Sequence, residues 1–171
     1  MTSAKRVTRP ATAAPRSRNR VSEGLPETAD VLQAKIRYVE TSALLAAWLE
    51  GDASAQRALR GPGRLITSSL THAEASRAVL RAQLARRVSP SEVLSLTRGL
   101  QAFAERCETV AVSDEVIRRV GRAFPVEPVR TLDAIHLATV ELLGQNPAAV
   151  TVVTRDARVR ANAIAMGWET E

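Results

Sequence analysis

Cysteine and aromatic residues are scarce in this chain of 171 residues. Cys107 is the single cysteine, which excludes an intrachain disulfide and a zinc site built from cysteines. Aromatic residues make up 3% of the sequence, so base stacking is not an expected mode of nucleic-acid binding, and any nucleic acid would be held by its phosphates. We expect a buried thiol and a reducing, cytoplasmic compartment.

Long apolar runs and several well-known catalytic motifs are also missing. No stretch of about 18 apolar residues occurs, so no membrane span is expected, and the N-terminus lacks the apolar core of a signal peptide. There is no G-x-S-x-G nucleophile elbow, no P-loop and no G-x-G-x-x-G fingerprint. The two histidines, His72 and His136, do not have the paired spacing of a zinc site.

The net charge of +6 is concentrated at one end of the chain. Residues 1–22 contain six basic residues and no acid, which leaves eighteen of the 24 basic residues facing all eighteen acids. We therefore expect residues 1–34, which lack hydrophobic periodicity, to form a basic disordered extension, and residues 35–171 to form one domain. The high pI describes the extension, so it is weak evidence for nucleic-acid binding by the domain.

Strands and helices alternate along residues 35–171. Apolar runs predict strands at 36–39, 64–67, 109–112 and 149–154, with an edge strand beginning at Trp168. Periodic apolar residues and capping signals predict helices at 41–49, 53–59, 70–86, 90–106, 115–123, 130–143 and 157–166. Alternation of this kind predicts a parallel sheet covered by helices on both faces, with a ligand site at the carboxyl ends of the strands.

Four acids occupy similar places, after a strand and at or near the start of a helix: Glu40, Glu74, Asp133 and Asp156. Each also has a local explanation. Thr131 is a candidate cap that would leave Asp133 in a first helical turn, Thr71 and Glu74 have the spacing of a capping box, and Asp156 can cap the last helix. If the four converge, their oxygen-only chemistry suits Mg²⁺ or Mn²⁺, and the implied reaction is phosphodiester hydrolysis.

Four motifs follow one another along the chain: Y-V-E-T-S-A-L-L at 38–45, S-x-x-x-x-E at 69–74, R-T-L-D-A-I-H-L-A-T at 130–139 and V-T-R-D at 153–156. In this order they resemble the PIN-domain family, in particular the VapC-like ribonuclease toxins of toxin–antitoxin pairs. The resemblance covers residues 35–171. It implies a three-layer α/β/α domain with a parallel sheet of about five strands, and a Mg²⁺- or Mn²⁺-dependent endoribonuclease. It also implies a homodimer and a cognate antitoxin that blocks the site.

The resemblance assigns roles to single residues. Glu74, Asp133 and Asp156 match acidic positions of the family's site, and Ser42 and Thr154 match hydroxyl positions that support the acids. Glu40 departs from the pattern, because the family usually has aspartate there. The extra methylene would shift the carboxylate or make the side chain fold back. We expect Glu40, Asp133 and Asp156 to bind the ion, and Glu74 to bind it through water or to orient the attacking water.

Other residues near the motifs have weaker claims. Arg77, Arg81 and Arg155 are candidates for binding RNA phosphates, although a solvated helix face explains them equally well. His136 is assigned to packing or to a hydrogen bond near the site.

Two further functions stay open on the sequence. The first is a PIN-like module that binds RNA or protein without cleaving, which the substitution at Glu40 motivates. The second is a structure-specific DNA nuclease, which the small size of the chain argues against.

Overall fold

A computed structural model describes residues 35–171, and the expected extension at residues 1–34 lies outside them. The strands are β1 (Ile36–Val39), β2 (Arg64–Ser68), β3 (Glu108–Val110), β4 (Val150–Val153) and β5 (Glu169–Thr170). The helices are α2 (Thr41–Leu49), α3 (Ala53–Ala58), α4 (Ser69–Leu84), α5 (Pro90–Arg106), α6 (Asp114–Val120), α7 (Thr131–Leu142) and α8 (Ala157–Ala165). Within residues 35–171 every helix is too short or too polar to span a bilayer.

The five strands form one parallel sheet in the order β3-β2-β1-β4-β5. Strand β1 is central, and its last residue, Val39, is level with Thr67 of β2 and Val153 of β4. The chain moves outward from β1 in one direction through β2 and in the other through β4. The carboxyl end of β1 is therefore the switch point in strand order, where open parallel sheets bind ligands.

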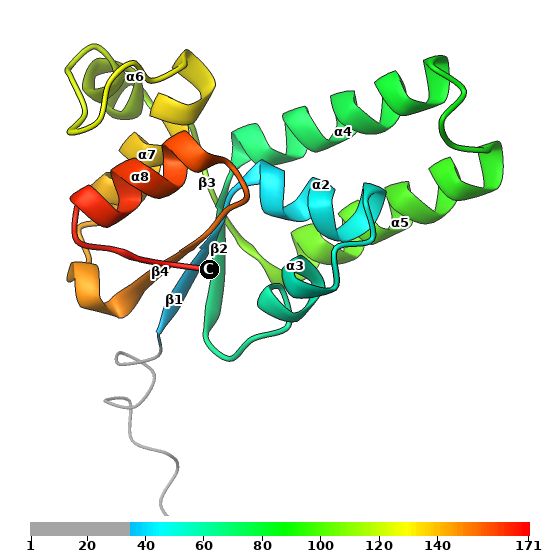
Figure 1. Ribbon diagram of the computed structural model, residues 1–171, viewed down its shortest axis with the longest axis horizontal. Helices are drawn as coiled ribbons and strands as arrows, with labels where there is room; N and C mark the ends of the chain where they lie inside the picture. Colours follow the sequence, from blue (N-terminus) through cyan, green and yellow to red (C-terminus); the bar gives the residue numbers. More distant parts are fainter. Residues whose placement is uncertain (1–34) are drawn as a thin grey trace, which may run out of the picture.

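Alternate residues of the central strands pack on opposite faces of the sheet. Ile36, Tyr38, Val150 and Val152 belong to the core shared with α6, α7 and α8. Val39 packs on the other face with residues of α2, α3, α4 and α5. Figure 1 shows these two helical layers on either side of the sheet, which confirms the predicted α/β/α architecture.

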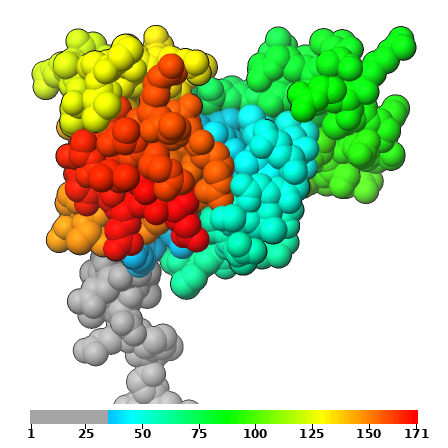
Figure 2. All heavy atoms as spheres, viewed as in Figure 1, coloured from blue at the N-terminus to red at the C-terminus, as the bar shows by residue number. Residues whose placement is uncertain are grey.

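Helices α4 and α5 form an antiparallel arm that extends away from the sheet (Figures 1 and 2). The turn between them ends in the expected cap: Ser89 and Glu92 form a complete capping box, with Pro90 in the first turn. Helix α4 of the arm packs against the body along α2.

Most predicted elements are present with ends shifted by one or two residues. Strand β3 and helix α6 end earlier than expected, at Val110 and Val120. Strand β3 is an edge strand paired only with β2, and beyond that pairing the N–H of Val112 donates to the Ser69 hydroxyl instead of continuing the strand.

Two predicted caps are wrong. Thr131 is the first residue of α7, and the N-cap of that helix is Arg130, whose side chain makes no capping hydrogen bond. Thr71 lies inside α4, whose N-cap is Ser68. The local explanation of Glu74 as part of a capping box therefore fails.

The thiol of Cys107 is buried, as predicted. Burial and the neighbouring Glu108 carboxylate raise its pKa to about 12, so the thiol stays protonated at neutral pH.

The turn before β2 depends on a glycine. Gly63 has φ of +118°, and a Cβ added there would lie 2.2 Å from the backbone carbonyl oxygen of Lys35. We expect Gly63→Ala to lower the free energy of unfolding by about 1–3 kcal/mol. Gly99 in α5 is the matched control, because a Cβ there meets no atom within 4 Å and alanine favours a helix by about 0.5–1 kcal/mol. Urea unfolding of the two variants tests the opposite signs, and equal stability would contradict the expectation.

Candidate functional site

The four predicted acids lie around the carboxyl end of β1. Glu40 follows β1 directly, and Asp156 follows β4 after a short connection. Glu74 lies in α4, the helix that follows β2, and Asp133 lies in the first turn of α7. The chain therefore brings acids from four separate segments to the switch point of the sheet.

Glu40 is 5% exposed and folds back onto its own helix as the N-cap of α2. Its Oε1 accepts from the N–H of Ser42 at 3.0 Å. Its Oε2 accepts from the hydroxyl of Thr154 at 2.8 Å and from the hydroxyl of Ser42. These donors fix the orientation of the carboxylate and lower the cost of burying its charge.

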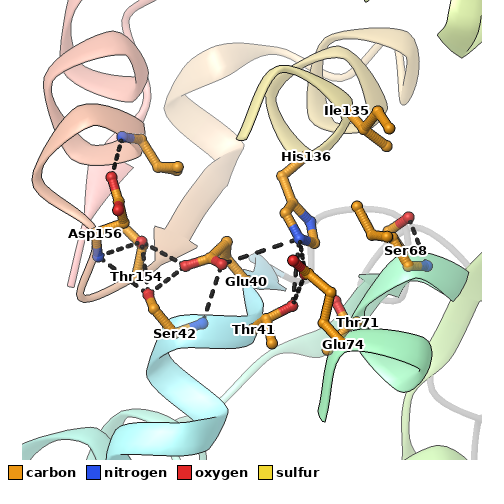
Figure 3. Close-up of polar contacts among 12 residues, drawn as sticks. Glu40, Thr41, Ser42, Ser68, Thr71, Glu74, Ile135, His136, Thr154 and Asp156 are labelled. Carbon is orange, nitrogen blue, oxygen red and sulfur yellow. Dashed lines mark hydrogen bonds and ion pairs between the residues drawn. The ribbon is translucent and has the colours of Figure 1, made fainter. Parts of the chain in front are cut away.

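Asp156 is the N-cap of α8, as predicted, and its Oδ1 accepts from the N–H groups of Arg158 at 2.7 Å and Val159 at 3.1 Å. Its own N–H donates to the hydroxyls of Ser42 at 3.0 Å and Thr154 at 3.1 Å. The same two hydroxyls thus bind the Glu40 carboxylate and the backbone of Asp156, which joins β1, α2 and α8 at one point (Figure 3).

In Figure 3, Glu74 lies on the opposite side of Glu40 from Asp156. Its Oε2 accepts from the Thr41 hydroxyl at 2.5 Å and contacts Nε2 of His136 at 3.0 Å. Partial burial would by itself raise the pKa of Glu74, but these two hydrogen bonds and the nearby charges outweigh it and hold the pKa below its usual value. Glu74 is therefore ionised at neutral pH.

His136 is 1% exposed and links Glu74 to the interior of the sheet. Its Nε2 faces two oxygens, Oε2 of Glu74 and the Thr41 hydroxyl at 3.3 Å, whose proton is already donated to Glu74. Nε2 must therefore carry a hydrogen, and Nδ1 accepts from the Tyr38 hydroxyl at 2.8 Å. This confirms the prediction of a hydrogen-bonding role near the site.

Two members of this network, Tyr38 and Thr41, were not predicted from the sequence. Tyr38 is fully buried in β1, and burial and the Glu40 charge raise the pKa of its hydroxyl well above the usual value. Both residues flank Glu40 and lie in the motif at 38–45, which marked them by position but assigned them no role.

Asp133 is the least satisfied of the four acids. Its Oδ2 is buried without any hydrogen-bond partner among the described residues. Desolvation, then the charges of Asp156 and Glu40, raise its pKa above the usual value. A cation beside Asp133 would give the unpartnered oxygen a partner and would offset the effects that raise the pKa.

Two sets of side chains are available to a metal ion. Oxygens of Glu40 and Glu74 and a nitrogen of His136 lie within 4.8 Å of one another, and no other such group of three occurs in residues 35–171. His136 could bind an ion through Nε2 only in the other tautomer, with its hydrogen on Nδ1 facing the Tyr38 hydroxyl. The carboxylates of Glu40, Asp133 and Asp156 do not all come within 4.8 Å of one another, but they offer only oxygen, which suits a hard cation, and an ion would satisfy the unpartnered Oδ2 of Asp133.

Arg155, a candidate phosphate ligand, is already engaged. It contacts Asp52 at 3.1 Å, the Ser54 hydroxyl at 3.1 Å and the carbonyl oxygen of Thr154 at 3.3 Å. Its guanidinium therefore ties the β4–α8 connection to α3.

Comparisons with known proteins agree with this geometry. The family model described as the PIN domain matches residues 37–165. Ribonuclease VapC35 of Mycobacterium tuberculosis is 39% identical over 141 residues, which cover 75% of this chain and 90% of that protein.

Solved structures of similar fold include the VapBC2 complex of Rickettsia felis bound to a promoter DNA fragment, with a TM-score of 0.54 and 14% identity over 80% of this chain and 97% of that chain. They also include a toxin–antitoxin complex of Klebsiella pneumoniae, with a TM-score of 0.51 and 19% identity over 73% of this chain and 90% of that chain. At this level of identity the structures support the fold. Because the family match includes all four acids and strands β2 to β4, and a ribonuclease 39% identical covers 75% of this chain, the chain belongs to the PIN-domain family.

Proposed function

We propose that the protein is a metal-dependent endoribonuclease, the toxin of a toxin–antitoxin pair. The observation that carries the proposal is the buried, unpartnered Oδ2 of Asp133 beside the charges of Asp156 and Glu40. The name of the similar ribonuclease from Mycobacterium tuberculosis supports RNA as the substrate. The toxin–antitoxin complexes of similar fold support a protein antitoxin. A homodimer in the cytoplasm completes the proposal.

Glu40, Asp133 and Asp156 would hold Mg²⁺ or Mn²⁺, with Glu74 close by. The ion, when bound, lowers the pKa of a coordinated water and neutralises charge that builds on the phosphoryl group. The hydroxyls of Ser42 and Thr154 act one step away, because they orient the Glu40 carboxylate and fix the position of Asp156.

Glu74 is the candidate to position the attacking water. Its two hydrogen bonds from Thr41 and His136 both end on Oε2. Oε1 is therefore left to accept a hydrogen bond from the attacking water. The lowered pKa keeps the carboxylate ionised for that role.

One observation favours a second candidate, a module that binds without cleaving. Glu40 stands where the family usually has aspartate, and both of its oxygens already accept hydrogen bonds from the protein. These donors compete with an ion for the Glu40 oxygens and so weaken metal binding. A site that binds no metal would bind RNA or protein without cleaving.

Cleavage of RNA by the purified protein tests the proposal. With Mg²⁺ or Mn²⁺ we expect cutting of total RNA that EDTA stops, and Asp133→Asn should reduce it by more than about a hundredfold, since a misplacement of about 1 Å alone costs that much. No cutting by a folded protein with either metal would instead support the binding module. Glu40→Asp, which shortens the side chain to the usual family residue, then tests whether Glu40 is the cause.

The raised pKa of Asp133 gives a stability prediction. Ionising Asp133 costs more in the folded than in the unfolded state, so its contribution to stability falls as pH rises from the usual aspartate pKa through the raised one. In EDTA at pH 7 we expect Asp133→Asn to raise the melting temperature by roughly 1–3 °C, a small value because solvent screens a half-buried group. Below the usual pKa this gain should vanish.

Asp52→Asn is the matched control, with the opposite sign. Hydrogen bonds from the Ala55 N–H and the Arg155 side chain hold the pKa of Asp52 below its usual value, so the amide should lower the melting temperature at pH 7. Added Mn²⁺ should raise the melting temperature of the unmodified protein and of Asp52→Asn, but not of Asp133→Asn. A destabilised Asp133→Asn variant would mean that the carboxylate serves the start of α7.

A further inference from the structure

A groove leads from the acids along the arm, between α2 and α4. A hollow of about 290 Å³ beside the site is lined by Glu74, Arg77 and Arg81 of α4, by Leu45 of α2 and by Leu132 of α7. A second hollow, of about 340 Å³, shares Leu45 and Arg81 with it and continues to Arg87. We call these two hollows together the α2–α4 groove.

The groove begins at the proposed catalytic groups. Glu74 lines its inner end, and Leu132 is the neighbour of Asp133 in sequence. Arg77 and Arg81 follow Glu74 by three and seven residues, so the three side chains share one face of α4. Arg81 is near enough to help lower the pKa of Glu74, which shows that its charge reaches the site.

The arginines of the groove are free to bind a ligand. Arg77, Arg81 and Arg87 are exposed, and none has an ion pair or a side-chain hydrogen bond within residues 35–171. Four other arginines are paired with acids: Arg37, Arg64, Arg119 and Arg155. The acids that line the groove are Glu74 at its inner end and Glu50 at its outer end, so cations dominate the part between them.

We propose that the α2–α4 groove binds the backbone of a single RNA strand next to the cleaved bond, with Arg77 and Arg81 contacting its phosphates. The inference rests on the proposed ribonuclease function and adds the path of the substrate. Arg77 and Arg81 are four residues apart in α4, so their backbones are separated by about 6 Å along the axis and their side chains can contact separate phosphates. Apart from its charged residues and Thr41, the groove is lined by leucine and alanine. It has no aromatic ring, so it would bind RNA with little preference for sequence.

Salt-dependent binding tests the groove separately from cleavage. The full chain carrying Asp133→Asn, in EDTA, is titrated into a fluorescently labelled single-stranded RNA of about 12 nucleotides, and anisotropy is measured between about 50 and 200 mM salt. Adding Arg77→Ala and Arg81→Ala should weaken binding roughly tenfold or more. The slope of log K against log salt should become shallower by about 1.4, or 0.7 for each lost phosphate contact.

Two controls define the outcome. Arg98→Ala with Arg118→Ala removes the same charge from exposed positions that line neither hollow, and should leave the slope unchanged. Arg77→Lys with Arg81→Lys keeps both charges and should keep the slope. In the active protein the groove variant should raise KM by a larger factor than it lowers kcat, because most of the binding it removes lies away from the reacting atoms.

Equal loss of affinity in both alanine pairs would overturn the groove proposal. Unchanged RNA binding in the groove variant would also overturn it, and would favour a protein as the groove's ligand. Either result, combined with metal-dependent cleavage, leaves the ribonuclease function standing. Absence of both RNA binding and cleavage would overturn the function itself.

Discussion

The need to hold several negative charges close together governs the structure around β1. Each carboxylate meets this constraint differently. Glu40 and Asp156 are bound by backbone N–H groups and hydroxyls, and Glu74 is bound by Thr41 and His136. Asp133 keeps one buried oxygen without a donor. The protein's own donors thus stabilise three of the four carboxylates. Asp133 is the one carboxylate with a buried oxygen that lacks a donor, and a bound cation would stabilise it.

Local signals in the sequence were sufficient for most of the fold. The strand Val150–Val153 is apolar at nearly every position because both faces of a parallel strand are covered, and Ser89, Pro90 and Glu92 mark the start of α5 unambiguously. The errors arose where tertiary contacts compete with local ones. Glu74 has the spacing of a capping partner for Thr71, yet it contacts Thr41 and His136 from other elements instead.

The site was predictable in its charged residues and not in its neutral ones. Glu40, Glu74 and Asp156 follow strands, which indicates convergence because all parallel strands end at one edge of the sheet, and Asp133 opens a helix that packs over that edge. The roles of Tyr38 and Thr41 depend on side-chain directions across β1, α2 and α7, for which spacing along the chain carries no information. For Glu40 the sequence left open a shifted carboxylate or a folded-back side chain, and the structure has the second, held by Ser42 two residues away and by the hydroxyl of Thr154, 114 residues away.

This separation also constrains the order of folding. The arm from Ser69 to Arg106 is continuous in sequence, and its contacts can form early, whereas the pairing of Val39 with Val153 must close a very long loop. The groups proposed to cut RNA meet only after the strand that ends at Val153 has joined the sheet. A chain still being synthesised, surrounded by the ribosome and its message, therefore carries no assembled site.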